Sequence, residues 1–461
     1  MIQRMVSIRA SRSACSAARP QRLWGFVRAQ WAARFAALLV TLSLCACQEH
    51  REEAAVDWQP PRPRNDDPTV RVRIARNLKN LRMATSGDLI VHPNGSGRYA
   101  AAGAAAGASA GARAFASPVS VRRTARGFSF SDKRGSRFEW PHSVLQIEDG
   151  AGGGIWIDGQ GYPGTAWLHA TAADGAAPRF DVVNHATMES YLPGVLDREL
   201  FPHWRNATFV AQAIAARSYA MHAMSKQRTQ HFDLEATSAS QNYAGITANP
   251  RAHQAVRSTR GLMLTYRGQV LPAYYSSCCG GVGQDAALAF PNSRDAVPLR
   301  GRAHGTWCAQ SRFHRWGPIR RATVTLGRRL ASWGRAHRHR IAAMRGLRAI
   351  TITRRNNVGR PAQFTITDTA RRSYNLNAET FRHACNHDDP ALDSLNPQRR
   401  LPSAHVDVTV NGSQVLFNAG RGHGHGVGMC QYGGEALAKA GYNAASILGF
   451  YYQGARIESV Y

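Results

Sequence analysis

With 461 residues the chain is long enough for two or three domains. Its formal net charge of +29 is strongly basic and predicts attraction to a polyanion. The sequence has no clear helix-turn-helix, zinc-finger or aromatic-basic RNA signature, which argues against nucleic acid as the partner. An exported lipoprotein rarely meets nucleic acid, so for such a protein an anionic cell wall or an outer-leaflet lipid is the better candidate.

The N-terminal segment, residues 1–47, has the pattern of an export signal. Its first 46 residues hold seven arginines and no acid, and an apolar run at 35–46 meets Cys47. Leu44–Cys45–Ala46–Cys47 fits a lipoprotein signal, with lipidation of Cys47. The run is shorter than the ~20 residues that span a bilayer, although an uncleaved anchor or a wrongly assigned start is the alternative. By similarity to bacterial lipoproteins, Gln48 permits outer-membrane sorting, so we expect a lipid-anchored periplasmic protein at that membrane.

The next residues predict a tether followed by a small β domain. Residues 48–68 are rich in proline, arginine and acids without an apolar period, which is typical of a flexible tether. Residues 69–180 hold short strand-like runs separated by turn formers, so a β-rich domain is expected there. The runs are 69–75, 87–93, 127–132, 143–149 and 153–159. Residues 100–116 are low-complexity, and a loop is favoured over a weak helix.

The remaining residues, 181–461, mix helices and strands without a regular βαβ alternation. This pattern predicts an α+β region of two lobes that form a cleft. A strand at 179–185 precedes a helix at 186–200 that is broken near Pro193 and Gly194. Residues 206–225 are the strongest helix, with Asn206 as its N-cap. Further strands are expected within 261–277 and around 321–326, 347–353, 361–367, 405–410 and 413–418, before one or two closing helices.

A glycine-rich segment, residues 420–441, predicts a site rather than a simple fold element. Alternating glycines let a bulky group approach the backbone, and in an extended segment His423 and His425 share one face. The segment follows a strand and precedes a helix, but it lacks the GK[ST] signature and acidic continuation of a phosphate or dinucleotide loop. The imidazoles therefore ligate a metal or contact a substrate, unless the glycines serve only close packing.

Glu199 is the strongest candidate for acid–base chemistry. It lies in a stretch that also holds Leu200, Phe201, Pro202 and Trp204. A carboxyl group among apolar neighbours has a raised pKa because its charged form is poorly solvated. A general acid for a glycosidic oxygen needs that property. On spacing alone, a solvated or helix-capping glutamate is the alternative.

Five cysteines follow Cys47, and an odd number leaves at least one thiol free or bound to metal in an oxidising compartment. Residues 273–285 hold two serines before two adjacent cysteines, which allows a serine nucleophile, a disulfide or a metal site. No GxSxG elbow supports the nucleophile. Cys279 and Cys308, with His304 or His314, are a weak zinc candidate because no CxxC pair is present.

Five motifs, in order, resemble the stage II sporulation protein D family, which includes amidase enhancers. They are NHATMESYLPGVLDRELFPHW, FVAQAIAARSYAM, SASQNYAG, AVRSTRGLMLTYRGQVLPAYYSSCCGG, and GRGHGHGVGMCQYGGEALAKAG with ILGFYYQGARI. The resemblance covers about 180–461, with a poor match around 286–380. It implies that 181–461 is the catalytic domain of a lytic transglycosylase. Such enzymes cut the MurNAc–GlcNAc bond of peptidoglycan without water and leave 1,6-anhydro ends, in the sporulation member on peptide-stripped strands.

The resemblance places the family's catalytic glutamate on Glu199. One carboxyl group then suffices: it protonates the leaving oxygen and accepts the proton of the sugar's own 6-hydroxyl, whereas hydrolysis usually needs two carboxylates. Candidates for holding substrate groups are Gln212, Arg217, Ser240, Gln241, Tyr243, Ser277, His423, His425 and Gln431. This chemistry requires no cofactor.

The resemblance also bears on the cysteines and on the partners. Some family members have cysteines at the positions that match Cys385 and Cys430. The resemblance therefore implies a disulfide or a shared metal between these two residues. The family's association with zinc keeps a structural zinc at Cys279, Cys308 and His304 open. Glycan strands and a cell-wall amidase are the implied partners.

Two other classes of function remain. A non-catalytic module that binds glycan and activates an amidase is the main alternative. A metal-dependent hydrolase built on His423 and His425 is the other, but it lacks an obvious third metal ligand.

Overall fold

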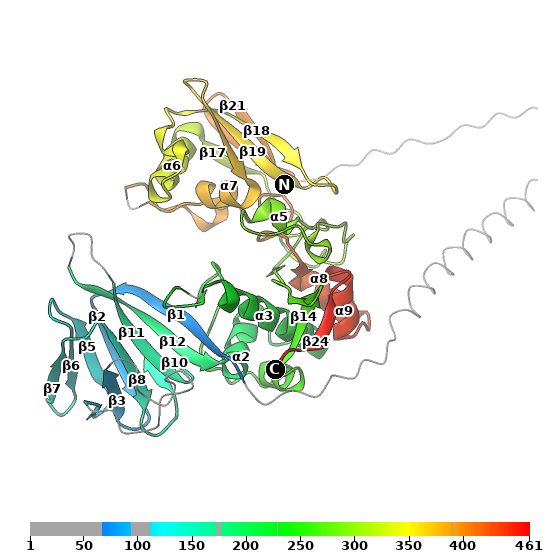
Figure 1. Ribbon diagram of the computed structural model, residues 1–461. Coiled ribbons are helices and arrows are strands. Elements are labelled where there is room, and N and C mark those ends of the chain that lie inside the picture. The colour runs from blue at the N-terminus through cyan, green and yellow to red at the C-terminus, as the bar shows by residue number, and fades with distance from the viewer. Residues whose placement is uncertain (1–66, 94–110, 172–176, 228, 390) are drawn as a thin grey trace, which may run out of the picture. The chain divides into compact units, whose positions relative to one another are not determined.

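The computed structural model describes residues 67–93, 111–171, 177–227, 229–389 and 391–461 (Figure 1). All of them belong to the second of two compact units, Trp58–Tyr461. The expected signal segment and most of the tether lie outside the described residues. The described part is a mixed α/β structure with several sheets and eight α-helices. None of these helices has the length and apolar character needed to cross a membrane.

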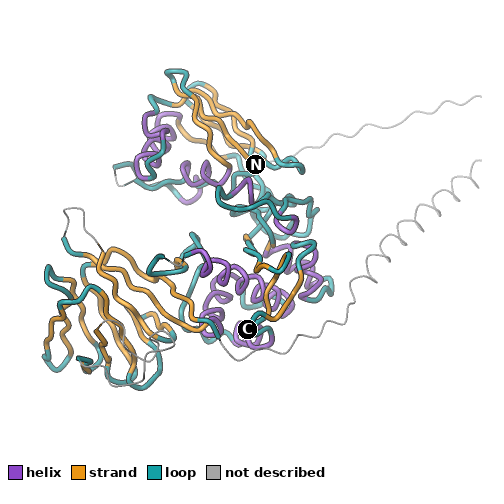
Figure 2. The backbone as a smooth tube through the Cα atoms, viewed as in Figure 1, coloured by secondary structure: helices purple, strands orange, loops and turns teal. Residues whose placement is uncertain are grey.

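Strands dominate the first part of the described chain, up to residue 187 (Figure 2). One sheet has the order β13 (Leu234–Glu235), β1 (Thr69–Leu78), β12 (Arg179–Thr187), β11 (Thr165–Thr171), β8 (Val144–Asp149), β3 (Leu89–Pro93) and β4 (Arg113–Phe115). The other has the order β10 (Gln160–Tyr162), β9 (Ile155–Ile157), β2 (Asn80–Thr85), β5 (Val119–Arg123), β6 (Phe128–Asp132) and β7 (Arg137–Trp140). All five runs predicted from alternation are strands.

Both sheets contribute to one hydrophobic core, because every second residue of each strand points inward. Phe128 and Phe130 of β6 and Phe180 and Val182 of β12 are all fully buried in it. β12 runs through the expected domain boundary at 180, and β13 joins the edge of the first sheet from a distant part of the sequence. Of the low-complexity segment, only its last residues are described, and they form β4.

Three helices follow: α2 (Met188–Glu199), α3 (Asn206–Lys226) and α4 (Pro250–Ser258). The expected break at Pro193 is wrong, because α2 continues through it. Proline removes one backbone hydrogen bond, but Leu192, Val195 and Leu196 bury the face of α2 that holds the helix together. Asn206 is not the N-cap either, since Arg205 holds that position. Glu435 instead accepts hydrogen bonds from the Arg205 backbone (2.9 Å) and Thr208 Oγ1 (2.8 Å), a favourable position for an acid.

The C-terminal residues return to pack on α3. β14 (Leu262–Tyr266) pairs with β15 (Gln269–Val270) and with β24 (Arg456–Ser459) near the C-terminus. β16 (Tyr275–Ser276) pairs in parallel with β23 (Met429–Cys430), which brings the cysteine-rich stretch beside the glycine-rich segment. The short α5 (Ala286–Ala289), α8 (Gln431–Lys439) and α9 (Ala444–Tyr451) complete this region.

Residues 319–418 form a separate hydrophobic core of two small sheets and two helices. The sheets are β17 (Ile319–Ala322), β22 (Gln414–Asn418) and β21 (Asp407–Asn411), and β18 (Leu347–Arg355), β19 (Pro361–Asp368) and β20 (Ser373–Asn377). The helices are α6 (Thr323–Ala336) and α7 (Ala378–Cys385), and short 3-10 turns span Val297–Leu299, Arg340–Ala343 and Pro397–Arg399.

Of the strand expected at 321–326, only residues 321–322 lie in a strand, β17. The chain turns helical at Thr323, because Leu326, Leu330 and Trp333 share one buried helix face.

Candidate active site

Glu199 is the last residue of α2, and its carboxylate is held by three N–H donors. Oε1 accepts hydrogen bonds from the Asn242 backbone N–H (3.1 Å) and side-chain amide (3.0 Å). Oε2 accepts one from the side-chain amide of Gln431 (3.0 Å). Burial raises the pKa of Glu199, and these hydrogen bonds oppose that rise only in part. The carboxyl group is therefore suited to carry a proton at a higher pH than an ordinary glutamate.

Two phenols lie close to this carboxyl group, the buried Tyr191 and the half-buried Tyr275. The amide of Gln241 connects them, since it donates to the Tyr275 hydroxyl (2.8 Å) and accepts from the Tyr191 hydroxyl (3.1 Å). Burial raises the pKa of both tyrosines well above the ordinary value, and the nearby charge of Glu199 adds to the effect. Glu199 is thus surrounded by amides and neutral phenols.

The glycine-rich segment reaches Glu199 through Gln431, the third residue after Gly428. Gly422, Gly424, Gly426 and Gly428 all have positive φ, between 67° and 88°. A Cβ at Gly428 would lie 2.0 Å from the Tyr274 carbonyl oxygen, so this position requires glycine. The backbone of this segment is therefore left-handed at every second residue, and the expectation of an extended segment is wrong. We call this part of the chain the glycine-rich turns.

The two histidines of this segment have different environments. His423 is exposed, and its ring packs on Phe313 at 4.5 Å between centroids. His425 Nδ1 accepts the Val427 backbone N–H (3.0 Å), and its ring contacts Phe290. Burial lowers the pKa of His425 to about 4, so this ring is neutral at pH 7. The pKa of His423 is also lowered, by partial desolvation where its ring packs and by the nearby charges of Arg382 and Arg312. Only His423 is free to contact a large ligand.

Arg360, a buried residue from the poorly matching middle of the chain, fixes the shape of this segment. Its guanidinium donates to the carbonyl oxygens of Cys279 (2.9 Å), Val282 (2.7 Å) and His425 (3.1 Å). A Cβ at Gly426 would lie 2.3 Å from its Nη1. The segment of 319–418 is thereby bound to the glycine-rich turns by a residue that motif reasoning did not identify.

A pocket of about 540 Å³ lies beside His423. Ser238, from the loop that leads to Asn242, forms part of its wall. Its aromatic and basic lining residues are Phe313, Trp333, His337, Arg382, His383, His387, Arg400 and His423, and no acidic residue lines it. Arg382 and Arg400 are themselves paired with Glu379 and Asp388. Aromatic rings and guanidinium groups together suit the faces and polar groups of a sugar.

A cluster of thiols lies behind the glycine-rich turns. The Sγ atoms of Cys278, Cys308 and Cys430 lie within 4.8 Å of one another. Cys279 Sγ is 3.8 Å from Cys308 Sγ, and His314 Nδ1 is 3.2 Å from the same sulfur. Hydrogen bonds from Cys278, Cys279 and Cys430 lower the pKa of Cys308, which favours one thiolate in the cluster.

This cluster corrects two expectations. His304 is not a member: its ring packs against Tyr451, and burial lowers its pKa to about 4. The disulfide between Cys385 and Cys430 is also wrong, because all five described cysteines are free. Cys385 is buried in the core of 319–418, whereas Cys430 belongs to the core that contains the other thiols.

A model of the stage II sporulation protein family, SpoIID, matches residues 177–266. An amidase enhancer of Bacillus subtilis is 25% identical over 293 residues, which are 58% of this chain and 40% of the relative. Stage II sporulation protein D of the same organism is 24% identical over 291 residues, 60% of this chain and 75% of the relative.

The chain is similar to the stage II sporulation protein D family, whose model matches residues 177–266. An uncharacterized protein of Brachyspira hyodysenteriae is also similar, at 29% identity over 281 residues, 60% of this chain and 68% of the relative. The resemblance identified from the five motifs is thus confirmed.

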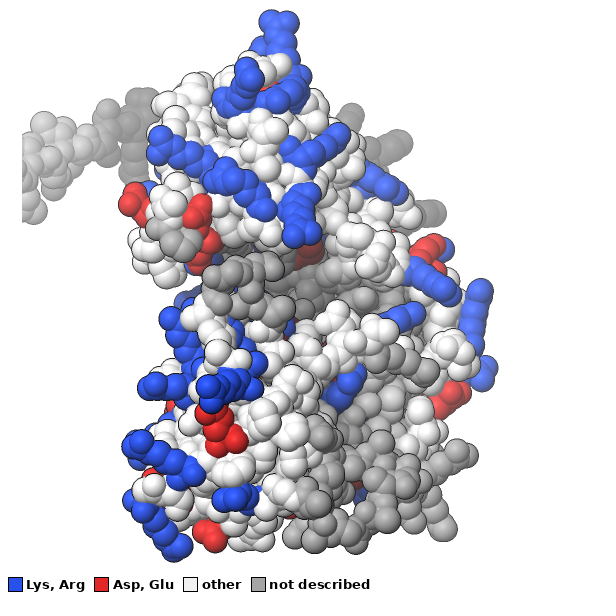
Figure 3. Space-filling model, turned by 60° about the vertical axis from the view of Figure 1, so that its left-hand side comes forward, with Lys and Arg blue, Asp and Glu red and all other residues white. Residues whose placement is uncertain are grey.

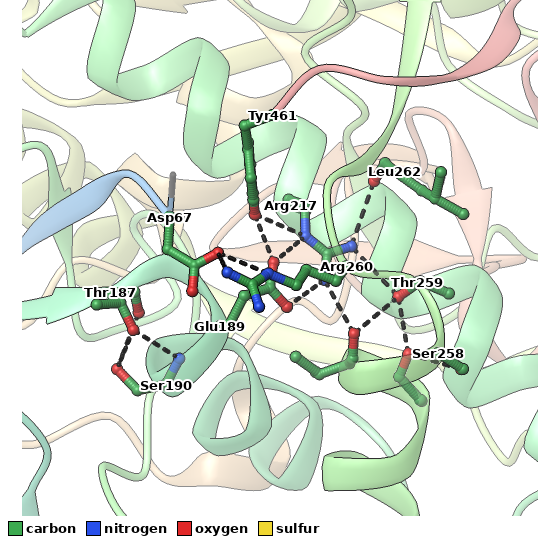
Figure 4. A network of polar contacts seen from close by, with 12 residues as sticks. Asp67, Thr187, Glu189, Ser190, Arg217, Ser258, Thr259, Arg260, Leu262 and Tyr461 are labelled. Atoms are coloured by element: carbon green, nitrogen blue, oxygen red, sulfur yellow. Dashed lines mark hydrogen bonds and ion pairs between the residues drawn. The ribbon is translucent and has the colours of Figure 1, made fainter. Parts of the chain in front are cut away.

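Arg217 is not available to a substrate (Figure 4). It is fully buried and forms two 2.8 Å hydrogen bonds with the Glu189 carboxylate. It also donates to the Tyr461 hydroxyl (3.1 Å) and to the carbonyl oxygens of Val256 and Leu262. These contacts tie α2, α3 and the C-terminus together, so we correct its predicted role to a structural one.

Other predicted substrate contacts are also internal. Gln212 is fully buried in α3. Tyr243 is buried and donates to Asn184 Oδ1 (3.0 Å). Ser240 is half-buried, and its hydroxyl accepts the Glu235 backbone N–H (3.1 Å). Ser277 is half-buried beside the thiol cluster, where its carbonyl oxygen accepts the Tyr432 N–H (3.1 Å).

The structure brings together Glu199, Gln241 and Gln431 from three motifs of the SpoIID family, and it adds residues that the motif reasoning missed. Asn242 lies between the predicted residues Gln241 and Tyr243, and Tyr275 lies two residues before Ser277. Cys278 is adjacent to the predicted ligand Cys279. A signal was present for each of these three residues, but the sequence did not distinguish which neighbour faces the site.

Proposed function

We propose that the protein is a lytic transglycosylase that cleaves MurNAc–GlcNAc bonds of peptidoglycan glycan strands, with Glu199 as its general acid and base. The observation that carries the proposal is the environment of this carboxyl group. Burial raises its pKa, three N–H donors orient it, and none of the groups that shift its pKa is charged. A single carboxyl group of this kind suits an intramolecular displacement, whereas hydrolysis usually needs two.

The reaction balances with the one carboxyl group. Protonated Glu199 gives its proton to the glycosidic oxygen as the bond from C1 of MurNAc to that oxygen breaks. The 6-hydroxyl oxygen of the same MurNAc forms the new bond to C1, and its proton passes to the Glu199 carboxylate. The donors from Asn242 and Gln431 stabilise the carboxylate between the two transfers. The products are a 1,6-anhydro end and a free GlcNAc end, and the carboxyl group is protonated again.

We further propose that the glycan lies in a cleft between the helical region and the lobe of residues 319–418. The pocket beside His423 supports this path, because its walls come from the loop before Asn242, from the glycine-rich turns and from α6 and α7. Phe313 and the exposed ring of His423 offer ring contacts for sugars, and Arg382 and Arg400 offer donors for acidic or hydroxyl groups.

The thiol cluster fits a structural zinc ion. Zinc prefers four sulfur or nitrogen ligands in a tetrahedron, in which Zn–S bonds of ~2.3 Å put the sulfur atoms ~3.8 Å apart. Cys279 and Cys308 have that separation, 3.8 Å. Cys278, Cys279, Cys308 and Cys430 would hold the ion, and His314 would donate to Cys308 from outside. The bound ion would supply cross-linking of the cysteine-rich stretch to the glycine-rich turns that position Gln431.

The cellular setting is proposed from the sequence. Export, lipidation of Cys47 and attachment to the outer membrane would hold the enzyme in the periplasm beside peptidoglycan. The relative named amidase enhancer supports a cell-wall amidase as the partner. That amidase would supply peptide-stripped strands as the substrate. The same relative favours the second candidate function, a glycan-binding activator of an amidase that cuts nothing itself.

Product analysis separates these functions. Purified wild-type protein and the Glu199→Gln variant are incubated with peptide-free glycan strands, and the products are read by mass spectrometry. The wild-type protein should release anhydro ends, and Glu199→Gln should reduce their rate ~100-fold or more, the usual contribution of general acid–base catalysis. Reducing ends would indicate a hydrolase, and intact strands with the wild-type protein would indicate a binding module. A fully active Glu199→Gln variant would contradict the assignment of Glu199.

A further inference from the structure

The outer face of the six-stranded sheet carries a trough of about 620 Å³ that the proposed reaction does not use. Its lining comes from β2, β5, β6 and β7 and the turn after β9. The inward residues of these strands fill the shared core, so the trough is formed by the alternate, outward residues. It lies in the part of the chain that precedes the family match.

The strand register arranges the outward side chains in two rows. In one row Arg82 lies opposite Ser120, Ser120 opposite Ser131, and Ser131 opposite Arg137. In the next row the order is Asn80, Arg122, Ser129 and Glu139. Short serine side chains therefore form the floor, and guanidinium groups stand at its sides. Three strand intervals of ~4.8 Å put the Cα atoms of Arg82 and Arg137 ~14 Å apart.

The three arginines of the trough are free to bind a ligand. Arg82, Arg122 and Arg137 are exposed, and no described residue forms a hydrogen bond or an ion pair with their side chains. Asp158 is the one acidic residue in the lining. Glu139, at the end of the second row, accepts a hydrogen bond from Thr124 (2.6 Å). Basic side chains are spread widely over one face of the molecule, with few acidic ones among them (Figure 3). A test of these three arginines must therefore be compared with the removal of the same charge elsewhere on the surface.

We propose that this trough is a second, non-catalytic binding site for an acidic polysaccharide, with carboxylates on Arg82, Arg122 and Arg137 and sugar hydroxyls on the serine floor. Guanidinium groups bind carboxylates through two parallel hydrogen bonds. A chain-like ligand with several carboxylates matches cations that are spread over four strands. A lipid surface fits less well, because Leu81 and Val121 are the only large apolar residues in the lining and both are buried.

The proposal goes beyond the cleavage site: such a trough would hold the protein on a glycan strand independently of Glu199. The test uses the full chain in the Glu199→Gln background, so that strands are not shortened while binding is measured. The site variant replaces Arg82, Arg122 and Arg137 with Gln. The matched control replaces three arginines of the same part of the chain that are exposed and lie outside the trough, Arg76, Arg126 and Arg134. Both variants lose the same charge.

Binding to peptide-stripped glycan strands, which carry free carboxylates, is measured at fixed ionic strength. The same strands with their carboxyl groups converted to amides are the second ligand. We expect the site variant to bind the acidic strands about tenfold more weakly than the control variant, ~1.4 kcal/mol. That difference should vanish on the amidated strands. An Arg→Lys version of the site variant keeps the charge but loses the planar donors, and it should recover only part of the affinity.

Several outcomes would overturn the proposal. Equal weakening by the site and control variants would mean that only net charge matters. A difference that persists on amidated strands would exclude carboxylate recognition. A loss of binding to phosphatidylglycerol vesicles without a loss on glycan would assign the trough to a membrane. Circular dichroism of each variant tests that the fold is intact, and the Arg→Lys version decides the question if the Gln version is unfolded. Because this comparison never depends on cleavage, it stands or falls separately from the proposed reaction.

Discussion

The hydrogen bond from Gln431 to Glu199 gives a quantitative test of how the site controls its proton. We consider Gln431→Met, which has a similar length and volume but no N–H donor. Gln431 is 4% exposed, and its amide lies 3.0 Å from Oε2 of Glu199. A hydrogen bond to a charged group contributes ~1.5–3 kcal/mol, and one pKa unit corresponds to ~1.4 kcal/mol. Loss of this donor should therefore destabilise the carboxylate form of Glu199 by ~1.5–3 kcal/mol and raise its pKa further than burial alone does.

The sign of the pH effect follows from the role of the proton. The reaction begins with protonated Glu199, so the rate falls as pH rises through the pKa of this group. A higher pKa of Glu199 therefore moves this alkaline limb of the pH profile to higher pH. The assay is kcat/KM for release of anhydro ends between about pH 4 and 9, because this parameter reports the free enzyme. The plateau should also fall, since the carboxylate left after proton transfer has lost a donor.

Two companion variants make the test specific. Asn242→Ala removes one of the two donors to Oε1 and leaves the backbone N–H, so the limb should move in the same direction. Gln310→Met removes an exposed amide that donates to the Tyr432 carbonyl oxygen, and the limb should not move. An unchanged or lowered limb in a folded Gln431→Met protein would refute the reasoning that this hydrogen bond sets the pKa of Glu199.

Two further predictions concern stability and metal content. Arg217→Met should lower the free energy of unfolding by ~3 kcal/mol, because the partly buried Glu189 carboxylate loses two charged hydrogen bonds and keeps only the one from the Tyr461 hydroxyl. Urea denaturation measures the loss, and a loss below about 1 kcal/mol would return Arg217 to the candidates for substrate binding. Cys308→Ser should abolish bound zinc, whereas the buried Cys385→Ser should retain it, as measured by elemental analysis of the purified proteins. Wild-type protein that contains no zinc under metal-replete conditions, or equal zinc in both variants, would contradict the proposed ligands.

The regular elements were largely predictable because their determinants are local. Alternating apolar residues predicted β1, β3, β6, β8 and β9, and apolar spacing predicted α3. The errors arose where buried contacts override local preference. Pro193 did not end α2, because the face of α2 around it is packed in the core. Thr323 begins a helix rather than continuing a strand, because Leu326 and Leu330 face the core of 319–418.

The sequence by itself indicated the resemblance to the stage II sporulation protein D family, the proposed acid and the chemical character of the glycine-rich turns. Motif order and residue type carry that information, and Glu199, Gln241 and Gln431 were all chosen from them. Only the tertiary structure decided which polar residues face one another. It placed Arg217 in a buried ion pair, separated Cys385 from Cys430, and gathered four thiols from distant segments. The physical reason is that a side chain's role depends on its burial and on partners that are far away in sequence. The residues next to it in the sequence specify neither.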